Sequence, residues 1–169
     1  MTPKPPVARV PLDQEQVVNA AADLADAEGL DALTLTRVAK ILGVRQPALY
    51  RHVESYQDLL RLLSLRGRDQ LAVALSEAAI GVSGDEAIGA VGRAWRETVL
   101  ASPGLYEATD RYPCAGDEEL EEAVERIVGV IAQALVGFDL DDDHRVHSAR
   151  ALRSAFHGFC HLESGDGHP

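Results

Sequence analysis

The chain has 169 residues, of which 46% are hydrophobic and 25% charged, which is ordinary for a globular protein and too apolar for a disordered one. It carries 16 basic against 27 acidic residues, and this net charge of −11 excludes a nucleic-acid-binding surface spread over the whole molecule. The charge is uneven, because residues 1–53 hold six bases and six acids, so the excess of acids belongs to the rest. No apolar run approaches the ~20 residues of a membrane helix, and we expect no membrane partner.

The first residues of the chain are rich in proline. Residues 1–11 also contain Lys4 and Arg9, so this segment is either a frayed terminus or an arm that lies along DNA. We favour the first interpretation and expect a flexible arm over residues 1–11. Apolar residues then recur at the helical period, which predicts a helix over residues 13–28 with Asp13 as its cap.

Residues 34–53 have the pattern of two short helices joined by a tight turn. Thr34 is suited to cap the first helix, and apolar residues follow it at the 3.6-residue period. Gly43 comes where a helix end favours a left-handed backbone, and Pro47 stands where a second helix can begin. This spacing predicts a helix-turn-helix, whose second helix would enter a major groove.

The charge of this stretch separates two interpretations. The helices could simply expose solvated arginines, or they could form a surface that faces phosphates. Residues 34–53 contain four bases and no acid, which is unusual in so acidic a chain and favours DNA binding. We therefore expect DNA contacts from this stretch and the start of the next helix, namely from Thr34, Thr36, Arg37, Arg45, Gln46, Pro47, Ala48, Tyr50, Arg51, His52 and Tyr56.

Residues 13–60 resemble the DNA-binding domain of the TetR family of transcriptional regulators. The resemblance rests on Ala39, Gly43-Val44 and Leu49-Tyr50, and residues 46–53 are especially close to the family's founding member. It implies an all-α fold with a three-helix helix-turn-helix head over residues 12–55. The antiparallel helical bundle that it implies over residues 56–169 would bind a ligand and form a dimer.

Patterns in the second part of the chain agree with such a bundle. Ser55 can cap a long helix over residues 55–79. Leucines occupy more than one side of this helix, which predicts that it packs on both the head and the body. Further helices are expected over residues 85–101, 117–136 and 141–163. Ser102-Pro103-Gly104 is typical of a helix end, and a short helical turn is expected after it at residues 105–110. The acids after Asp117 could hold a cation, but we favour compensation of the helix dipole.

The C-terminal part resembles the Trp-His-Gly subgroup of TetR ligand domains. The similarity lies in Ser102-Pro103-Gly104-Leu105-Tyr106 and in Phe156-His157-Gly158-Phe159. Arg153 departs from it, because it stands about where the subgroup has tryptophan. The chain also stops where relatives continue into one more helix, so we expect a body that is either minimal or truncated.

No pattern predicts catalysis or a bound metal. The chain lacks a nucleophile motif and a glycine-rich phosphate loop, so we expect no enzyme activity. His144 and His147 form one close pair in the sequence, and His157 and His161 form another. The ten-residue spacing from His147 to His157 places the two pairs on different sides of the helix, so they cannot share one metal ion. We expect no metal ion and no cofactor other than a small effector.

Several aromatic residues of the body either make core or line a cavity between helices. The resemblance favours an effector pocket for a small apolar ligand, lined by Trp95, Tyr106, Tyr112, Phe156 and His157.

These observations predict a homodimeric repressor that a small apolar ligand releases from a palindromic DNA operator. Two cysteines and no signal peptide predict a cytoplasmic location with free thiols. The alternative is a ligand- or partner-binding helical protein that keeps the head without operator-specific regulation.

Overall fold

The described residues of the chain form an elongated all-helical molecule. The structure is a computed structural model that describes residues 11–164, so the arm expected at residues 1–11 lies outside it except for Pro11. In chain order the elements are α1 (Gln14–Glu28), the 3₁₀ helix η1 (Leu30–Ala32), α2 (Leu35–Ile41), the 3₁₀ helix η2 (Gln46–Arg51), α3 (Tyr56–Ala78), α4 (Gly84–Ala101), α5 (Pro103–Arg111), α6 (Glu118–Ala134), the 3₁₀ helix η3 (Leu135–Gly137) and α7 (Asp142–Ser164). The predicted all-α fold is confirmed.

Side-chain caps explain where many of these helices begin. Asp13 and Gln16 form a reciprocal capping box at the start of α1. Thr34, Ser55 and Asp117 accept a bond from the third N–H of α2, α3 and α6, respectively. The predicted starts therefore agree with the structure to within a residue or two.

Two elements differ from the sequence-based expectation. The second helix of the helix-turn-helix is the short 3₁₀ helix η2, whose backbone bonds run from Ala48 to Arg45 and from His52 to Leu49. Ser102-Pro103-Gly104, expected only to end a helix, also opens a new one, because Pro103 is the first residue of α5. Proline suits this first position as well as it suits a helix end.

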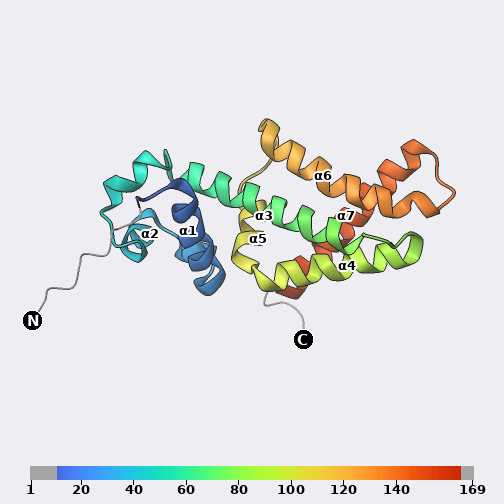
Figure 1. Cartoon of the computed structure of the whole chain (residues 1–169), viewed down its shortest axis with the longest axis horizontal. Helices are drawn as coiled ribbons and strands as arrows, with labels where there is room; N and C mark the ends of the chain where they lie inside the picture. Colours follow the sequence, from blue (N-terminus) through green and yellow to red (C-terminus); the bar gives the residue numbers. More distant parts are fainter. Residues whose placement is uncertain (1–10, 165–169) are drawn as a thin grey trace, which may run out of the picture.

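The long helix α3 joins two hydrophobic clusters. In the head, Leu59 and Leu63 of α3 pack with α1, α2 and η2. Further along, Leu71 and Leu75 pack with the body helices around Trp95. Figure 1 shows α3 running from the head at one end of the molecule into the body formed by α4, α6 and α7. The prediction that this helix packs on both parts is confirmed.

Helix α5 lies between α1 and α3 and contacts both at very short range. A Cβ atom on Gly104 would lie 2.2 Å from the carbonyl group of Ala25 in α1, so only glycine permits this approach. Asp26 of α1 accepts a hydrogen bond of 2.8 Å from the backbone N–H of Leu105, and thereby caps α5 from another helix. The head therefore docks on α5 directly as well as through α3 (Figure 1).

The two cysteines form no disulfide. Cys114 is partly buried and Cys160 is buried, and both are free thiols. None of the helices within residues 11–164 combines the length and the apolar character that crossing a bilayer requires.

Candidate DNA interface and effector site

The turn between α2 and η2 is held by backbone hydrogen bonds. Gly43 has a φ of 66°, in the left-handed region, and its N–H donates to the Lys40 carbonyl. The N–H of Val44 donates to the Ala39 carbonyl, which completes a Schellman motif. Leu49 and Val53 are buried in the head core. This arrangement fixes which residues of η2 face outward.

The residues expected to contact DNA all lie between the cap of α2 and the first residue of α3. Arg37, Gln46, Ala48, His52 and Tyr56 are partly buried, whereas the exposed members of the set are Thr34, Thr36, Arg45, Pro47, Tyr50 and Arg51. The structure thus gathers them on α2, the turn and η2. Their contacts with DNA remain a prediction.

Gln46 belongs to a hydrogen-bonded chain across this surface. The Thr36 hydroxyl donates to Gln46 Oε1 at 2.8 Å, and Gln46 Nε2 donates to the Tyr50 hydroxyl at 3.2 Å. These bonds leave one lone pair and one N–H of the amide free, which is the pair that bidentate contact with adenine needs. Thr36 and Tyr50 therefore position the amide.

The bases of the stretch fall into two groups. Arg37 is held inside the head, because it pairs with Glu28 at 2.5 Å and donates to the Ala32 carbonyl. Lys40, Arg45 and Arg51 are exposed and form no ion pair within residues 11–164. Three cations thus remain available to an anionic partner.

In the body, three of the predicted ligand residues form a second hydrogen-bonded chain. Trp95 Nε1 lies 3.0 Å from the Tyr106 hydroxyl, which lies 2.6 Å from His157 Nδ1. Since the indole can only donate, the hydroxyl accepts from it, and the same hydroxyl shares a hydrogen bond with Nδ1. The other ring nitrogen of His157, Nε2, lies 3.5 Å from Asp110 Oδ1. Burial raises the pKa of Tyr106 well above its usual range, which keeps the hydroxyl a donor.

A cavity of about 80 Å³ adjoins this chain. Trp95, Tyr106 and His157 line it, and so do Leu71, Thr109, Val124, Ile127 and the charged residues Arg68, Asp110 and Arg153. Its wall is therefore more polar than the apolar pocket expected from the sequence. A larger cleft of about 290 Å³ lies on the other side of Tyr106 and Asp110, between α1 and α5, and reaches His161.

The other two predicted ligand residues do not line this cavity. Phe156 packs against Trp95, with ring centroids 5.9 Å apart. Tyr112 packs on the head cluster, and its carbonyl accepts from Ser64 and Arg68 of α3. The structure therefore places Tyr112 apart from the other four, and a role for it at the effector site remains a prediction.

Arg68 lines the cavity but was not among the residues predicted from the sequence, although its position in a stripe of leucines indicates that it is buried. Leu60, Ser64, Arg68, Leu71 and Leu75 recur at helical spacing along the buried side of α3, so a charge lies within a leucine stripe. Arg68 is 7% exposed, and it donates to the carbonyls of Ser64 and Thr109. Burial lowers the pKa of its guanidinium, and the nearby charge of Arg153 lowers it further.

The described residues offer no metal centre. Within residues 11–164 no group of three or more histidine, cysteine, aspartate or glutamate side chains is placed to hold a metal ion. His144 instead lies 2.8 Å from Asp141 at the start of α7.

Comparison with known proteins identifies the family. Residues 17–63 match the family described as bacterial regulatory proteins, tetR family, and residues 88–169 match the tetracyclin repressor-like C-terminal domain. The HTH-type transcriptional regulator Rv0681 of Mycobacterium tuberculosis is 33% identical over 153 residues, which cover 90% of this chain and 70% of that protein. The chain belongs to the TetR family.

The chain is also similar to tetracycline repressors and to solved structures of the TetR family. Over 58 residues, or 34% of the chain, it is 43% identical to the class E tetracycline repressor of Escherichia coli, of which the match covers 26%. A possible TetR regulator from Streptomyces coelicolor A3(2) superposes with a TM-score of 0.70 at 25% identity, covering 93% of this chain and 76% of that one. The resemblance to the Trp-His-Gly subgroup remains a prediction. Members of this family are DNA-binding regulators and not enzymes, as expected.

Proposed function

We propose that this TetR-family regulator is a homodimeric cytoplasmic repressor that binds a near-palindromic operator and leaves it when a small, largely apolar effector binds the body. The observation that carries operator recognition is the Thr36–Gln46–Tyr50 chain on a surface with three cations that form no ion pair among residues 11–164. The cations supply affinity for phosphates, and the held amide supplies a preference for one base. Gln46, Tyr50 and Arg51 lie on η2, the element that enters the major groove in this motif, and Lys40 of α2 and Arg45 of the turn flank it.

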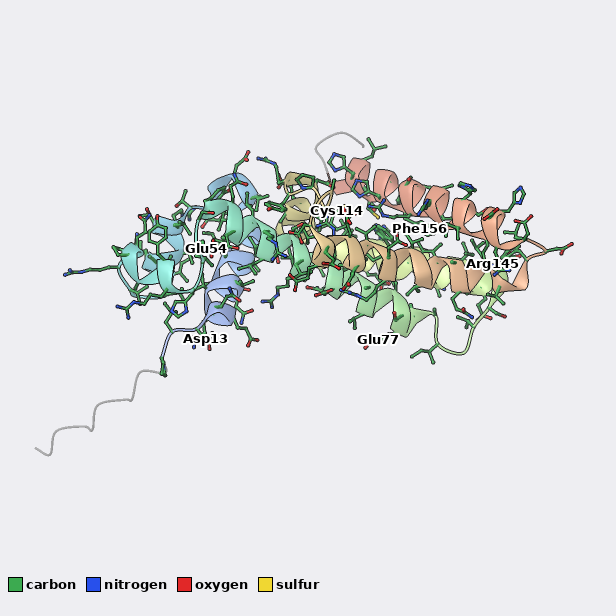
Figure 2. The ribbon with its side chains drawn as sticks, turned by 90° about the horizontal axis from the view of Figure 1, so that it is seen from above. Asp13, Glu54, Glu77, Cys114, Arg145 and Phe156 are labelled. Atoms are coloured by element: carbon green, nitrogen blue, oxygen red, sulfur yellow. The ribbon has the colours of Figure 1, made fainter. Side chains whose placement is uncertain are left out.

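Dimerisation is supported by an exposed apolar side of α7. Phe159 is 61% and Leu162 56% exposed, and because they are three residues apart they lie on the same side of the helix. The small residues Ala151, Ser154 and Ala155 are also exposed, so a second helix can approach closely there. Figure 2 shows α7 along one edge of the body. We assign this side to contact with a second copy, together with part of α6.

The release of DNA is assigned to a movement of α5. Tyr106 touches the cavity, and its neighbour Leu105 is bonded to Asp26 of the head. An effector that displaces Tyr106 therefore shifts α1 through α5, in addition to any movement of α3. The effector favours the conformation in which the two heads no longer match successive major grooves. A useful switch needs ~1–3 kcal/mol of such coupling.

A mobility shift with DNA from beside the protein's own gene tests this function. Binding to one palindromic site that survives excess random DNA is the expected result. A protein that binds no DNA specifically would instead be a helical ligand- or partner-binding protein that has kept the head.

Replacing Gln46 by alanine tests base recognition. Gln46→Ala should weaken binding by ~1–3 kcal/mol at one base position and relax the preference there, because the bidentate contact is lost. Arg51→Ala is the matched control, since loss of a phosphate contact weakens all sequences alike and reduces the salt slope by about 1. Unchanged base preference in Gln46→Ala would show that the amide does not read DNA.

A further inference from the structure

The cavity beside Trp95 has a wall with an excess of positive charge. Two guanidinium groups line it, from Arg68 of α3 and Arg153 of α7, but only one carboxylate, that of Asp110. His157 lies at the same wall, where its Nδ1 shares a hydrogen bond with the Tyr106 hydroxyl. Trp95 and the apolar residues of the wall leave the remaining surface neutral.

Arg68 is a buried cation that carbonyl groups hold in place. It donates to the carbonyl of Thr109 at 2.8 Å and to Ser64, and forms no ion pair with any residue of the described range. Buried arginines are normally paired with an anion, since desolvation of the charge is costly. The carbonyls satisfy donors of Arg68 without neutralising its charge.

Arg153 is partly buried and has no hydrogen bond or ion pair to a residue within 11–164. Other arginines of the body form ion pairs with nearby acids, such as Arg96 with Glu163 and Arg126 with Asp69. A guanidinium has planar donors that match a carboxylate in bidentate geometry. Arg153 thus presents an unused anion-binding group at the same cavity as Arg68.

We propose that this cavity binds a small carboxylate anion between Arg68 and Arg153. Its volume of about 80 Å³ suits a carboxylate group and excludes a drug-sized ligand, which needs roughly 300–1,000 Å³. The anion neutralises a wall on which two cations face one acid. The inference rests on the proposed effector site, and it replaces a purely apolar effector by one whose recognised group is an acid.

The position of the anion links it to the head. Arg68 belongs to α3 and Arg153 to α7, so an anion between the arginines joins these two helices beside Tyr106 of α5. Tyr106 lies in the first turns of α5, directly after Leu105, whose N–H is held by Asp26 of α1. Occupation of the cavity therefore acts on the same helix that docks the head.

The single tryptophan of the chain makes the site directly measurable, because Trp95 lines the cavity. Sodium acetate is titrated into the protein without DNA at constant ionic strength, and Trp95 fluorescence and heat of binding are recorded. Acetate should produce a saturable change, whereas acetamide, a neutral molecule of the same shape, should produce none. A response to acetamide equal to that of acetate, or no saturable heat with acetate, overturns the proposal.

Two substitutions on the same helix identify the binding group. Arg153→Gln should weaken acetate binding about tenfold or more, which corresponds to ~1.4 kcal/mol. Arg150→Gln removes the same charge from α7 at an exposed position and should leave binding unchanged. Arg153→Lys should retain part of the affinity. Full affinity in Arg153→Gln, or equal losses in both glutamine variants, contradicts a site between the arginines.

The DNA measurement is kept separate so that the two proposals can fail independently. Wild-type protein that binds its operator but shows no acetate response overturns the anion site and leaves the proposed function standing. Protein that binds acetate with the expected dependence on Arg153 but no DNA overturns the proposed function and leaves the site.

Discussion

Gly104→Ala is expected to destabilise the protein by ~3 kcal/mol, at the upper end of what overpacking costs. The added Cβ would lie 2.2 Å from the Ala25 carbonyl carbon and oxygen, and 2.7 Å from the Asp26 backbone nitrogen. Backbone atoms of a helix cannot rotate away as a flexible side chain can. The substitution therefore separates α1 from α5 and stretches the bond between Asp26 and the Leu105 N–H.

A melt followed by circular dichroism measures this effect, with an expected fall of the midpoint by roughly 6–12 °C for a chain of this size. Gly129→Ala is the matched control. Gly129 is exposed within α6, and a Cβ atom added to it would have no neighbour within 4 Å, so alanine should stabilise the helix by ~0.5–1 kcal/mol. Equal midpoints for the two variants would show that α1 and α5 separate at no cost.

Ala155→Glu is expected to convert the protein into monomers and to lower operator affinity by roughly 10²–10⁴-fold. Ala155 lies on the exposed apolar side of α7, near Phe159, where we place the contact with a second copy. A carboxylate there is buried without a partner on association, which is costly. Operator affinity falls because two linked heads bind two half-sites far more tightly than one head binds one.

Sedimentation and a mobility shift measure the two effects on the same sample. Ile80→Glu is the control, because Ile80 is a large apolar residue, 77% exposed, that lies beyond the end of α3 rather than on α7. It should leave a dimer with wild-type affinity. Residues Val73, Ile80 and Val130 line a groove between α3 and α6. Dissociation by Ile80→Glu rather than Ala155→Glu would move the interface to this groove, and a monomeric wild-type protein would refute dimerisation.

Most of the helices could be predicted from interactions between residues that are close in the sequence. The predicted helices begin at Asp13, Thr34, Ser55 and Asp117, because a side-chain cap satisfies orphan N–H groups within three residues of itself. The left-handed backbone at Gly43 could also be predicted, because glycine has no Cβ atom and adopts a positive φ without strain. The four bases and the absence of acids in residues 34–53 can also be read without tertiary information, and this charge pattern predicted a DNA-binding head.

Where a local signal fits two structures, the sequence could not choose between them. Pro103 and Gly104 can end a helix or begin one, and the contact with Ala25 requires that they begin α5. Tyr112 is expected in the body together with the other aromatic residues of that part of the chain. Its place in the head cluster depends on the direction in which the chain leaves α5.

The sequence by itself therefore determined the helices, the DNA-binding motif and the family to which they belong, because caps, turns and periodicity act between residues close in the chain. Only the tertiary structure decided what lies at the cavity. Tyr106 meets His157 across 51 positions, and Arg68 and Arg153 reach one wall from two helices. Whether an arginine is solvated or faces a cavity depends on what packs over it, and that is a property of the assembled helices.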